Sequence, residues 1–600
     1  LVLFTLGWEK GVKKEKVWED TMDWKLHFKR WMEHENLYED LKEELQGIHT
    51  NEKQLEECFY KNLEFGTGGM RGEIGPGTNR MNVYTIRKAT EGLARYMEEK
   101  GEDAKKRGVV IAYDVRRKSP EFALEAALTL GKHGIPAYLF DECRPTPVLS
   151  FAVRHLKAYM GIVITASHNP PEYNGYKVYG PDGGQLPPDM ADVVIDRVDQ
   201  VENELLVEVS TEEELKNLNL LHIVGEEIDQ AYLKEIEQLP INRELIEQMA
   251  DHLKIVYTPL HGTGSKLVPE SLRKVGFNQV TVVAEQKEAD ANFTTVKSPN
   301  PEEHAAFALA IEYGNGLNAD LLLATDPDAD RVGAAVKNPS GEYEILTGNQ
   351  TGAILLHYIL MMRSNQGTLP KNGAIIKTIV TSDMGRVIAS HFGLETMETL
   401  TGFKFIGEKI KEFEETGSHT YLFGYEESYG YLIKEFARDK DAVQSCVMIA
   451  EVAAYYKSRG MTLYEGLHEL YQQYGCFLEG LQSMTLKGKE GLAQISAILS
   501  YFRNEPPVEV AGEQVSIIED YQVSRRYLLV ENKEEALTLP VSNVLKYILA
   551  NGSWFCLRPS GTEPKIKIYF GVQEKTYEES KELLSRLKNE VMERITSFLG

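Results

Sequence analysis

Along most of the chain, short apolar runs rich in β-branched residues alternate with longer stretches whose apolar residues recur at helical spacing. This alternation predicts an α/β fold, in which each helix carries the chain back so that the next strand can run parallel to the last. At 600 residues the chain is too long for one hydrophobic core, and roughly three to five domains are expected. We predict strands at 109–113, 162–165, 255–258, 280–283, 321–324 and 375–378, and helices at 84–98, 120–133, 301–313, 349–362 and 442–457. A last helix is predicted where Leu584, Leu587, Val591 and Ile595 form a one-sided apolar stripe.

One predicted strand ends in a polar loop that presents a serine. The apolar run 160–164 is followed at 165–170 by Thr-Ala-Ser-His-Asn-Pro, in which the serine is Ser167. An apolar run that ends in such a turn is typical of a buried strand that delivers one side chain to a loop. A serine hydroxyl can carry a covalent intermediate, but it is a poor nucleophile unless a second element activates it or stabilises the charged adduct.

A second strand of the same layout ends in three carboxylates. After its apolar residues the chain places Asp326, Asp328 and Asp330 at every second position, and Arg331 follows. Three acids in one tight loop repel one another unless a cation lies between them, so the spacing predicts a divalent metal site. An EF-hand is excluded because Arg331 occupies its glycine position and Lys337 its final glutamate position. Mg2+, which takes a few carboxylates and completes its shell with phosphate oxygens or water, fits best; a plain acidic surface turn is the disfavoured alternative.

Three further loops complete a pattern that resembles one family. The segments 65–72, 424–428 and 558–564 read Phe-Gly-Thr-Gly-Gly-Met-Arg-Gly, Gly-Tyr-Glu-Glu-Ser and Arg-Pro-Ser-Gly-Thr-Glu-Pro. Together with the serine and aspartate loops, and in the same order, they resemble the active-site loops of the α-D-phosphohexomutases, the phosphoglucomutases and phosphomannomutases. The resemblance extends from about Trp24 to the C-terminus, and the motif sequences are most similar to those of the longer bacterial phosphoglucomutases and of the phosphopentomutase-like branch.

The resemblance implies an architecture of four domains around a central cleft. Three would be similar α/β domains with mixed sheets, and the last a smaller C-terminal α+β domain. We expect the domains at 22–211 with the phosphoserine loop, 212–342 with the metal loop, 343–469 with the sugar-binding loop and 470–600 with the phosphate-binding loop. Residues 1–21 are expected to be an extension outside the folded unit.

The resemblance also implies an intramolecular phosphotransferase that interconverts glucose 1-phosphate and glucose 6-phosphate. Ser167 would carry the phosphoryl group, glucose 1,6-bisphosphate would be the intermediate and activator, and Mg2+ would be bound by Ser167 with Asp326, Asp328 and Asp330. Pentose phosphates or mannose phosphates are the alternative substrates in the same family. A serine phosphatase is disfavoured because it gains little from a second phosphate site. A catalytically silent binding scaffold is disfavoured because the serine and all three aspartates are present.

Several positions match the family's site residues, with structural alternatives for some of them. His168 could equally be a neutral ring that shapes the loop, Thr401 could cap a helix over 405–414, and Arg558 alone would read as a solvated turn. The positions expected to act in catalysis are Arg71, His168, Lys177 and Lys440, next to Ser167. Those expected to bind substrate are Arg331, Thr401, Gly402, Lys404, Glu426, Ser428, Arg558, Ser560, Gly561 and Thr562.

Composition limits the kinds of partner. With 66 basic and 91 acidic residues the net charge is -25, which disfavours a dedicated nucleic-acid or anionic-membrane protein. The five cysteines are scattered without metal-ligand spacing, so reduced thiols and a cytoplasmic location are expected. The apolar start of the chain is only six residues long and has no basic region ahead of it, which fits neither a signal peptide nor a membrane span. We expect a phosphosugar as the small-molecule partner and a monomer or homodimer.

Overall fold

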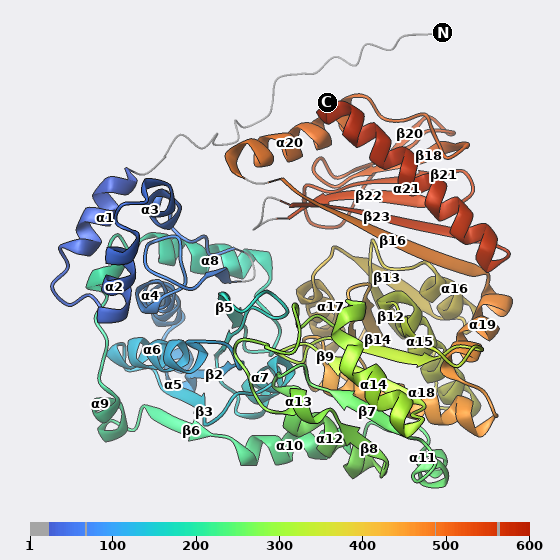
Figure 1. Cartoon of the computed structure of the whole chain (residues 1–600), viewed down its shortest axis with the longest axis horizontal. Coiled ribbons are helices and arrows are strands. Elements are labelled where there is room, and N and C mark those ends of the chain that lie inside the picture. Colours follow the sequence, from blue (N-terminus) through green and yellow to red (C-terminus); the bar gives the residue numbers. More distant parts are fainter. Residues whose placement is uncertain (1–22, 67–68, 487, 561–564) are drawn as a thin grey trace.

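The computed structural model describes residues 23–66, 69–486, 488–560 and 565–600, which contain four β-sheets with helices packed against them (Figure 1). Each sheet is built by one continuous stretch of chain, and we call these stretches the first to fourth domains. Three of the sheets are mixed and the fourth is antiparallel, which confirms the predicted architecture of three α/β domains and a C-terminal α+β domain. The predicted extension at 1–21 lies outside the described residues.

The first domain has a six-stranded sheet in the order β1-β5-β4-β2-β3-β6, in which only β5 runs against its neighbours. Strand β6 joins this sheet although it lies beyond residue 211, so the boundary predicted there falls inside the segment that builds the sheet. The strands are β1 (Met70–Glu73), β2 (Val109–Tyr113), β3 (Ala137–Phe140), β4 (Met160–Ile164), β5 (Tyr173–Tyr179) and β6 (Leu221–Val224). The helices are α1 (Trp24–Met32), α2 (Glu39–Ile48), α3 (Glu52–Phe59), α4 (Val83–Glu99), α5 (Glu102–Arg107), α6 (Ser119–Lys132), α7 (Thr146–His155), α8 (Pro188–Asp199), η1 (Glu204–Leu206) and α9 (Glu212–Asn217).

The second domain has a five-stranded sheet in the order β11-β10-β9-β7-β8. Strands β7, β8 and β9 are parallel, and β10 runs antiparallel to β9 and β11. The strands are β7 (Ile255–Thr258), β8 (Val280–Val282), β9 (Leu321–Thr325), β10 (Val332–Lys337) and β11 (Tyr343–Leu346). The helices are α10 (Glu226–Ile236), α11 (Arg243–Met249), α12 (Gly264–Val275), α13 (Ala284–Lys287), η2 (His304–Phe307) and α14 (Ala308–Leu317). Since β11 begins at residue 343, this sheet also extends past the boundary predicted at residue 342.

The third domain has a four-stranded sheet in the order β13-β12-β14-β15, with β15 antiparallel to β14. Helix α18 is apolar on all sides and almost wholly buried, as expected of a helix enclosed by neighbouring elements. The strands are β12 (Gly373–Thr378), β13 (Glu395–Thr399), β14 (Thr420–Glu426) and β15 (Gly430–Leu432). The helices are α15 (Gly348–Asn365), α16 (Met384–His391), α17 (Phe403–Thr416), α18 (Ala442–Ser458) and α19 (Leu463–Tyr474).

The fourth domain has an antiparallel sheet whose main path is β16-β23-β22-β21-β18-β19-β20, with β17 paired to β18. The strands are β16 (Cys476–Thr485), β17 (Glu509–Val510), β18 (Glu513–Asp520), β19 (Arg525–Leu528), β20 (Lys533–Ala536), β21 (Leu545–Leu549), β22 (Trp554–Pro559) and β23 (Lys565–Glu574). The helices are α20 (Gly488–Asn504) and α21 (Tyr577–Leu599). Leu587, Val591 and Ile595 of α21 are buried, which confirms the predicted apolar stripe, while Leu584 is partly buried against the same core.

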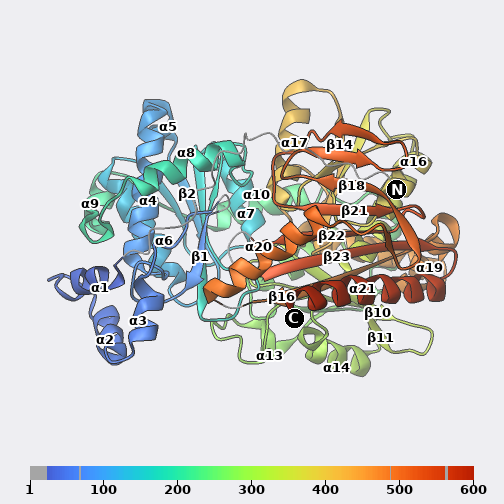
Figure 2. The ribbon, with the colours of Figure 1, turned by 90° about the horizontal axis from the view of Figure 1, so that it is seen from above.

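Apolar side chains of the third and fourth domains pack together. Ile379 and Leu400 form one buried cluster with Tyr521 and Trp554, and Lys546 Nζ donates to the carbonyl oxygen of Ile379 at 2.7 Å. Figure 1 shows the fourth domain above the third, and from above (Figure 2) the first domain stands to one side of them. Among the described residues, no helix combines the length and apolar character that crossing a membrane requires.

All six predicted strands are present to within two residues, and four of the five predicted internal helices are present as well. The helix predicted at 301–313 is wrong at its start. A 3-10 turn occupies His304–Phe307 and the α-helix begins only at Ala308. Glu302, just before the turn, pairs with Arg331 at 2.5 Å, so the chain is drawn toward the aspartate loop before the helix can begin.

Candidate active site

Four of the predicted functional loops, one in each domain, occupy the same place in their sheets. Each one connects two neighbouring antiparallel strands: β4 to β5, β9 to β10, β14 to β15 and β22 to β23. In the first three domains the loop follows a strand that also pairs with a parallel neighbour, so it emerges at the carboxyl edge of the sheet. This edge is where ligands bind in open α/β sheets.

Ser167 lies in a strained, buried turn directed at the aspartate loop. Its φ is +52°, in the left-handed region, and the residue is 3% exposed. Its backbone N–H donates to Thr165 Oγ1 at 2.8 Å, and its hydroxyl donates to Asp326 Oδ2 at 2.8 Å. The structure therefore brings the serine of the first domain into contact with an acid of the second, as the sequence predicted for a shared site.

Asp326, Asp328 and Asp330 converge as predicted. All three are buried, and each offers a carboxylate oxygen within 4.8 Å of the others. Asp326 Oδ1 accepts from the backbone N–H groups of Asp330 at 3.2 Å and Arg331 at 3.0 Å. Within the described part of the chain, Asp328 Oδ1 and Asp330 Oδ1 are buried without a hydrogen-bond donor. Three buried carboxylates that converge, two of them with an oxygen that lacks a hydrogen-bond donor, fit a hard divalent cation such as Mg2+.

The carboxylates of the same loop repel one another when no cation lies between them. Burial and the neighbouring Asp328 and Asp330 carboxylates raise the pKa of Asp326 well above its usual range. Burial alone would also raise the pKa of Asp328, but Lys177 and Lys440 hold it below its usual range. Asp326 and Asp328 are therefore in unequal states, because Lys177 and Lys440 act on Asp328 and favour its charged form.

Two lysines from different domains contact the aspartates. Lys177 Nζ lies 3.1 Å from Asp328 Oδ2 and 3.7 Å from Asp330 Oδ2. Lys440 Nζ lies 3.1 Å from Asp330 Oδ2 and 3.0 Å from Asp439 Oδ1. Although burial opposes it, these carboxylates hold the pKa of Lys440 above its usual range, so its ammonium group is a fixed positive charge.

The aspartate loop is held by all three α/β domains. Thr146 of the first domain donates through Oγ1 to Asp328 Oδ2 at 3.1 Å, and through its backbone N–H to the Asp328 carbonyl at 2.9 Å. From the third domain, the N–H of Ala442 donates to the carbonyl of Ala329, and the carbonyl of Tyr429 accepts from the N–H of Val332. These bonds fix the position of the second-domain loop relative to its neighbours.

His168 and Arg71 lie beside the serine loop. His168 Nδ1 is 3.2 Å from Ser167 Oγ, with roles that depend on the ring tautomer. Burial and the nearby Arg331 and Arg71 guanidinium groups hold the pKa of His168 well below its usual range, which fits a neutral ring. Arg71 Nη1 donates to Asn169 Oδ1 at 3.1 Å and so approaches the loop from strand β1.

The predicted sugar-binding residues form a second group, on the third domain. Glu426 is buried and accepts from the backbone N–H of Gly402 at 2.8 Å, which joins the 401–404 and 426–428 segments. Ser428 and Thr401 are half-buried. The alternative in which Thr401 caps a helix is wrong, because α17 begins at Phe403 with Gly402 as its N-cap, at a φ of +117°, and no side chain caps it.

The predicted phosphate-binding residues are only partly described. Arg558 is half-buried at the end of β22, Nη1 donates to Tyr569 OH at 3.4 Å, and Ser560 is half-buried. Gly561 and Thr562 lie outside the described residues. Burial and the Arg558 guanidinium lower the pKa of Lys404 to about 8 against the opposing effect of Glu408 and Asp192, so a lysine of the predicted sugar-binding loop lies near the predicted phosphate-binding arginine.

Four residues with clear roles in the geometry were missed. Asp439 pairs with Lys440, Glu302 pairs with Arg331, and Asp114 and Arg116 hold the serine loop. The signal for the last two was available, because both directly follow the strand at 109–113, which runs parallel to the strand before Ser167. Glu302 had no such signal, since it lies in the segment that was predicted to be helical.

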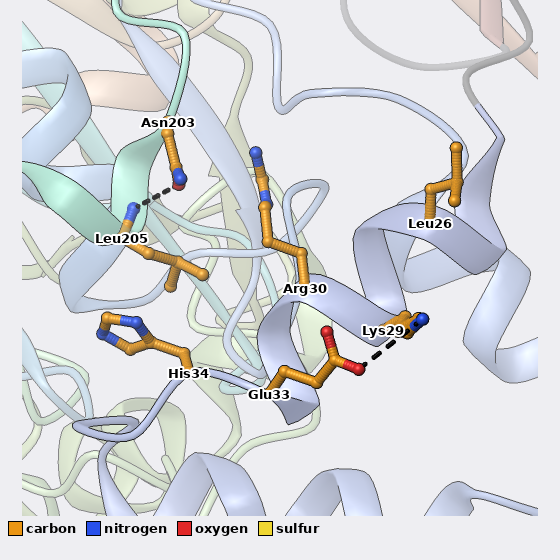
Figure 3. Close-up of a pocket in the computed structure, with 7 residues that line it drawn as sticks. All are labelled: Leu26, Lys29, Arg30, Glu33, His34, Asn203 and Leu205. Carbon is orange, nitrogen blue, oxygen red and sulfur yellow. Dashed lines mark hydrogen bonds and ion pairs between the residues drawn. The ribbon is translucent and has the colours of Figure 1, made fainter.

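A separate hollow lies between helix α1 and residues 203–205 (Figure 3). Its polar side chains are largely paired: Lys29 lies 3.6 Å from Glu33, and Arg30 Nη2 lies 2.6 Å from Glu204. It contains none of the predicted site residues.

Four family models match successive parts of the chain. Their descriptions are the Phosphoglucomutase/phosphomannomutase alpha/beta/alpha domains I, II and III and the C-terminal domain of the same family, at residues 62–205, 230–341, 347–474 and 508–593. Together they cover most of the chain, in the order that the four sheets follow.

Curated relatives are similar over nearly their whole length. A phosphoglucomutase of Staphylococcus haemolyticus is 39% identical over 524 residues, 87% of this chain and 93% of the relative. A phosphoglucomutase of Staphylococcus aureus is 39% identical over 555 residues, 92% of this chain and 96% of the relative. Among solved structures, a putative phosphomannomutase from Thermus thermophilus aligns with a TM-score of 0.66 at 22% identity, over 89% of this chain and 99% of its own. At that identity the likeness supports the fold alone.

Proposed function

The chain belongs to the phosphoglucomutase/phosphomannomutase family, and we propose that it interconverts glucose 1-phosphate and glucose 6-phosphate. The observation that carries this proposal is the contact between Ser167 Oγ and Asp326 Oδ2, which joins the hydroxyl of one domain to the acidic trio of the next. Because the similar curated relatives are named phosphoglucomutase, we choose glucose over other sugars.

We propose that Ser167 carries a phosphoryl group in the resting enzyme. A hydroxyl of the sugar phosphate would attack the phosphorus, and the bond between the phosphorus and Ser167 Oγ would break, which gives glucose 1,6-bisphosphate. This intermediate would then reorient within the site and return its other phosphoryl group to Ser167 Oγ. The attacking hydroxyl loses a proton and the serine oxygen gains one. His168 Nδ1, 3.2 Å from Ser167 Oγ, is placed to move the proton at that atom, whereas Lys177 and Lys440 are engaged with the aspartates.

We propose that Asp326, Asp328 and Asp330, with an oxygen on Ser167, hold Mg2+. When bound, the cation supplies Lewis-acid neutralisation of the phosphoryl oxygens. Lys177 and Lys440 would keep Asp328 and Asp330 oriented while it binds, because each donates to a carboxylate oxygen other than the unpartnered one. Arg558, Ser560 and the adjoining loop would hold the distal phosphate, and Glu426, Ser428, Thr401, Gly402, Lys404 and Arg331 would contact the sugar phosphate.

A coupled assay tests the proposal. The purified protein is supplied with Mg2+ and glucose 1-phosphate, with and without glucose 1,6-bisphosphate, and glucose 6-phosphate is measured with its dehydrogenase. Mannose 1-phosphate and ribose 1-phosphate are assayed in parallel, with detection suited to each product. We expect the highest kcat/KM with glucose 1-phosphate and loss of turnover on chelation. Faster turnover of another sugar would reassign the substrate, and no turnover of any would favour a binding scaffold.

A further inference from the structure

The backbone of Ser167 adopts an unfavourable conformation that must be maintained by its surroundings. At a φ of +52° a residue with a side chain is in the left-handed region, which is disfavoured except for glycine, asparagine and aspartate. Such residues persist where neighbouring groups hold them, and they concentrate at functional sites. Both backbone polar groups of Ser167 are held here, one by each member of a buried pair.

Arg116 holds the carbonyl side of the loop. Its side chain is fully buried, and its forked guanidinium group donates to four backbone carbonyl groups of the turn. Nη2 donates to the Ser167 carbonyl at 2.6 Å and also to that of Asn169, while Nη1 donates to the carbonyls of Pro170 at 2.7 Å and Tyr173 at 3.0 Å. One rigid group therefore fixes the turn from the serine to the start of β5.

Asp114 holds the amide side of the loop through Thr165. Asp114 Oδ2 accepts from Thr165 Oγ1 at 2.7 Å, and this hydroxyl oxygen in turn accepts from the Ser167 N–H at 2.8 Å. The same carboxylate lies 3.2 Å from Arg116 Nε, so the acid and the base orient each other. Neighbouring parallel strands β2 and β4 place the pair and the loop at one edge of the sheet.

The second domain covers this pair. The guanidinium carbon of Arg116 lies 5.1 Å from the ring centroid of Phe293, which is itself buried and has a φ of +49°. Next to it, Arg117 Nε donates to Asn292 Oδ1 at 2.8 Å. The serine loop is thereby tied to the same domain that supplies the aspartates.

We propose that Asp114 and Arg116 are positioning residues for phosphoryl transfer at Ser167. With both backbone groups of the serine fixed, the direction of its Cα–Cβ bond is fixed, and the hydroxyl is directed at Asp326. A lysine cannot replace Arg116, because its ammonium group has three hydrogens on one nitrogen and cannot donate to four separate carbonyl oxygens. A misplacement of the reacting oxygen by about 1 Å costs on the order of 100-fold in rate, so the effect on transfer is large while substrate and metal binding are spared.

Arg116→Lys and Asp114→Asn test this inference, with Arg87→Lys as the matched control. Arg87 is also in the first domain, pairs with a carboxylate, Glu125, and stacks on the aromatic ring of Tyr84, but it lies away from the serine loop. Dephosphorylated protein is mixed with glucose 1,6-bisphosphate in a quench-flow instrument, and phosphoserine is measured by intact mass. Mg2+ affinity, the KM for glucose 1-phosphate and the melting temperature are measured on the same proteins.

We expect the phosphorylation rate of Arg116→Lys to fall by about 100-fold, with Mg2+ affinity and KM within about threefold of wild type and Arg87→Lys unaffected. The phosphorylation rate of Asp114→Asn should fall in the same way. An unchanged rate in folded Arg116→Lys overturns the inference. So does a rate loss matched by equal losses of metal and substrate affinity, or by an equal rate loss in Arg87→Lys.

Hydrogen exchange separates this inference from the proposed function on which it rests. Without any substrate, the amides of residues 165–173 should exchange at least several-fold faster in Arg116→Lys than in wild type or Arg87→Lys. If the wild type turns over no phosphosugar, the proposed function fails, and the exchange measurement still decides whether the pair holds the loop. Equal exchange in all three proteins overturns the inference even where turnover is normal.

Discussion

Removal of one hydroxyl from the first domain should weaken the metal site of the second. Thr146 is buried, and its Oγ1 donates to Asp328 Oδ2 at 3.1 Å, while its backbone N–H donates to the Asp328 carbonyl. Thr146→Val keeps the shape and the backbone bond and removes only the side-chain donor. The hydroxyl of Thr146 therefore helps to orient the Asp328 carboxylate, whose Oδ1 has no hydrogen-bond partner in the described part of the chain, within the group of three acids.

The expected loss of Mg2+ affinity in Thr146→Val depends on the charge of the Asp328 carboxylate and on Lys177, which still donates to it. A hydrogen bond to a charged group contributes about 1.5–3 kcal/mol, and at about 1.4 kcal/mol per tenfold this corresponds to roughly 10- to 150-fold in affinity. Residues that orient metal ligands typically change affinity by about 10- to 100-fold. Since Lys177 Nζ still donates to the same oxygen at 3.1 Å, we expect the lower end, about a tenfold weaker Mg2+ Kd.

Calorimetric titration of Mg2+ into chelator-stripped, dephosphorylated protein measures this Kd at fixed pH and ionic strength. Thr129→Val is the matched control, because Thr129 is equally buried in the same domain and its Oγ1 donates only to the Glu125 carbonyl, at 2.8 Å. Both variants should lose some stability to urea, but only Thr146→Val should lose metal affinity. A Kd within twofold of wild type, or an equal loss in Thr129→Val, would refute the reasoning.

Three other outcomes are expected. Ser167→Ala should abolish protein-bound phosphate; intact mass showing wild-type stoichiometry in that variant would place the donor elsewhere. Arg558→Lys should mainly raise the KM for glucose 1-phosphate, since a distal clamp holds ground and transition states alike, and steady-state kinetics showing a large fall in kcat alone would contradict this. Burial raises the pKa of Asp441 to about 6, although Tyr232 and Gln444 donate to its carboxyl group. Between about pH 4 and 6 the unfolded chain has released this proton and the folded chain has not. The free energy of unfolding should therefore fall by up to about 3 kcal/mol as the pH rises through this range. Urea unfolding of Asp441→Asn should show a weaker pH dependence there, and an unchanged dependence would disprove the assignment.

The sequence predicted the strands well because their signal is local. Runs such as 109–113 and 321–324 are apolar and end in turn residues, and burial in a parallel sheet requires nothing else of them. The start of the helix at 301–313 was mispredicted because a contact distant in the chain, between Glu302 and Arg331, overrides the local preference. The boundaries predicted at 211 and 342 fall inside the segments that build the first two sheets, because β6 and β11 lie beyond them and pair with earlier strands. Such short runs resemble linkers until their pairing is known.

Within the site, sequence predicted the residue types but not their pairing. Three aspartates at every second position are equivalent in spacing, and nothing in the chain indicates that Asp326 is the one that meets Ser167. The division of labour between Lys177 and Lys440 is likewise a product of tertiary packing, since the two are supplied by different domains. Asp114 and Arg116 directly follow the predicted strand at 109–113, so their position could be read from the sequence, but their bonds to backbone carbonyls and to a threonine could not.

The charges around the aspartate loop explain why an acid-rich loop can be buried at a domain junction. Lys177 and Lys440 pair with Asp328, Asp330 and Asp439, and Arg331, which pairs with Glu302, also lies 3.9 Å from Asp330 Oδ1. Without a cation this crowding of acids raises the pKa of Asp326 well above its usual range, because burial and the carboxylates of Asp328 and Asp330 disfavour its charged form. A divalent cation supplies the missing positive charge at the place where two carboxylate oxygens are without donors among the described residues. The loop is thus best understood as a half-site: its acids are placed by three domains, and a cation together with the phosphate on Ser167 would complete it.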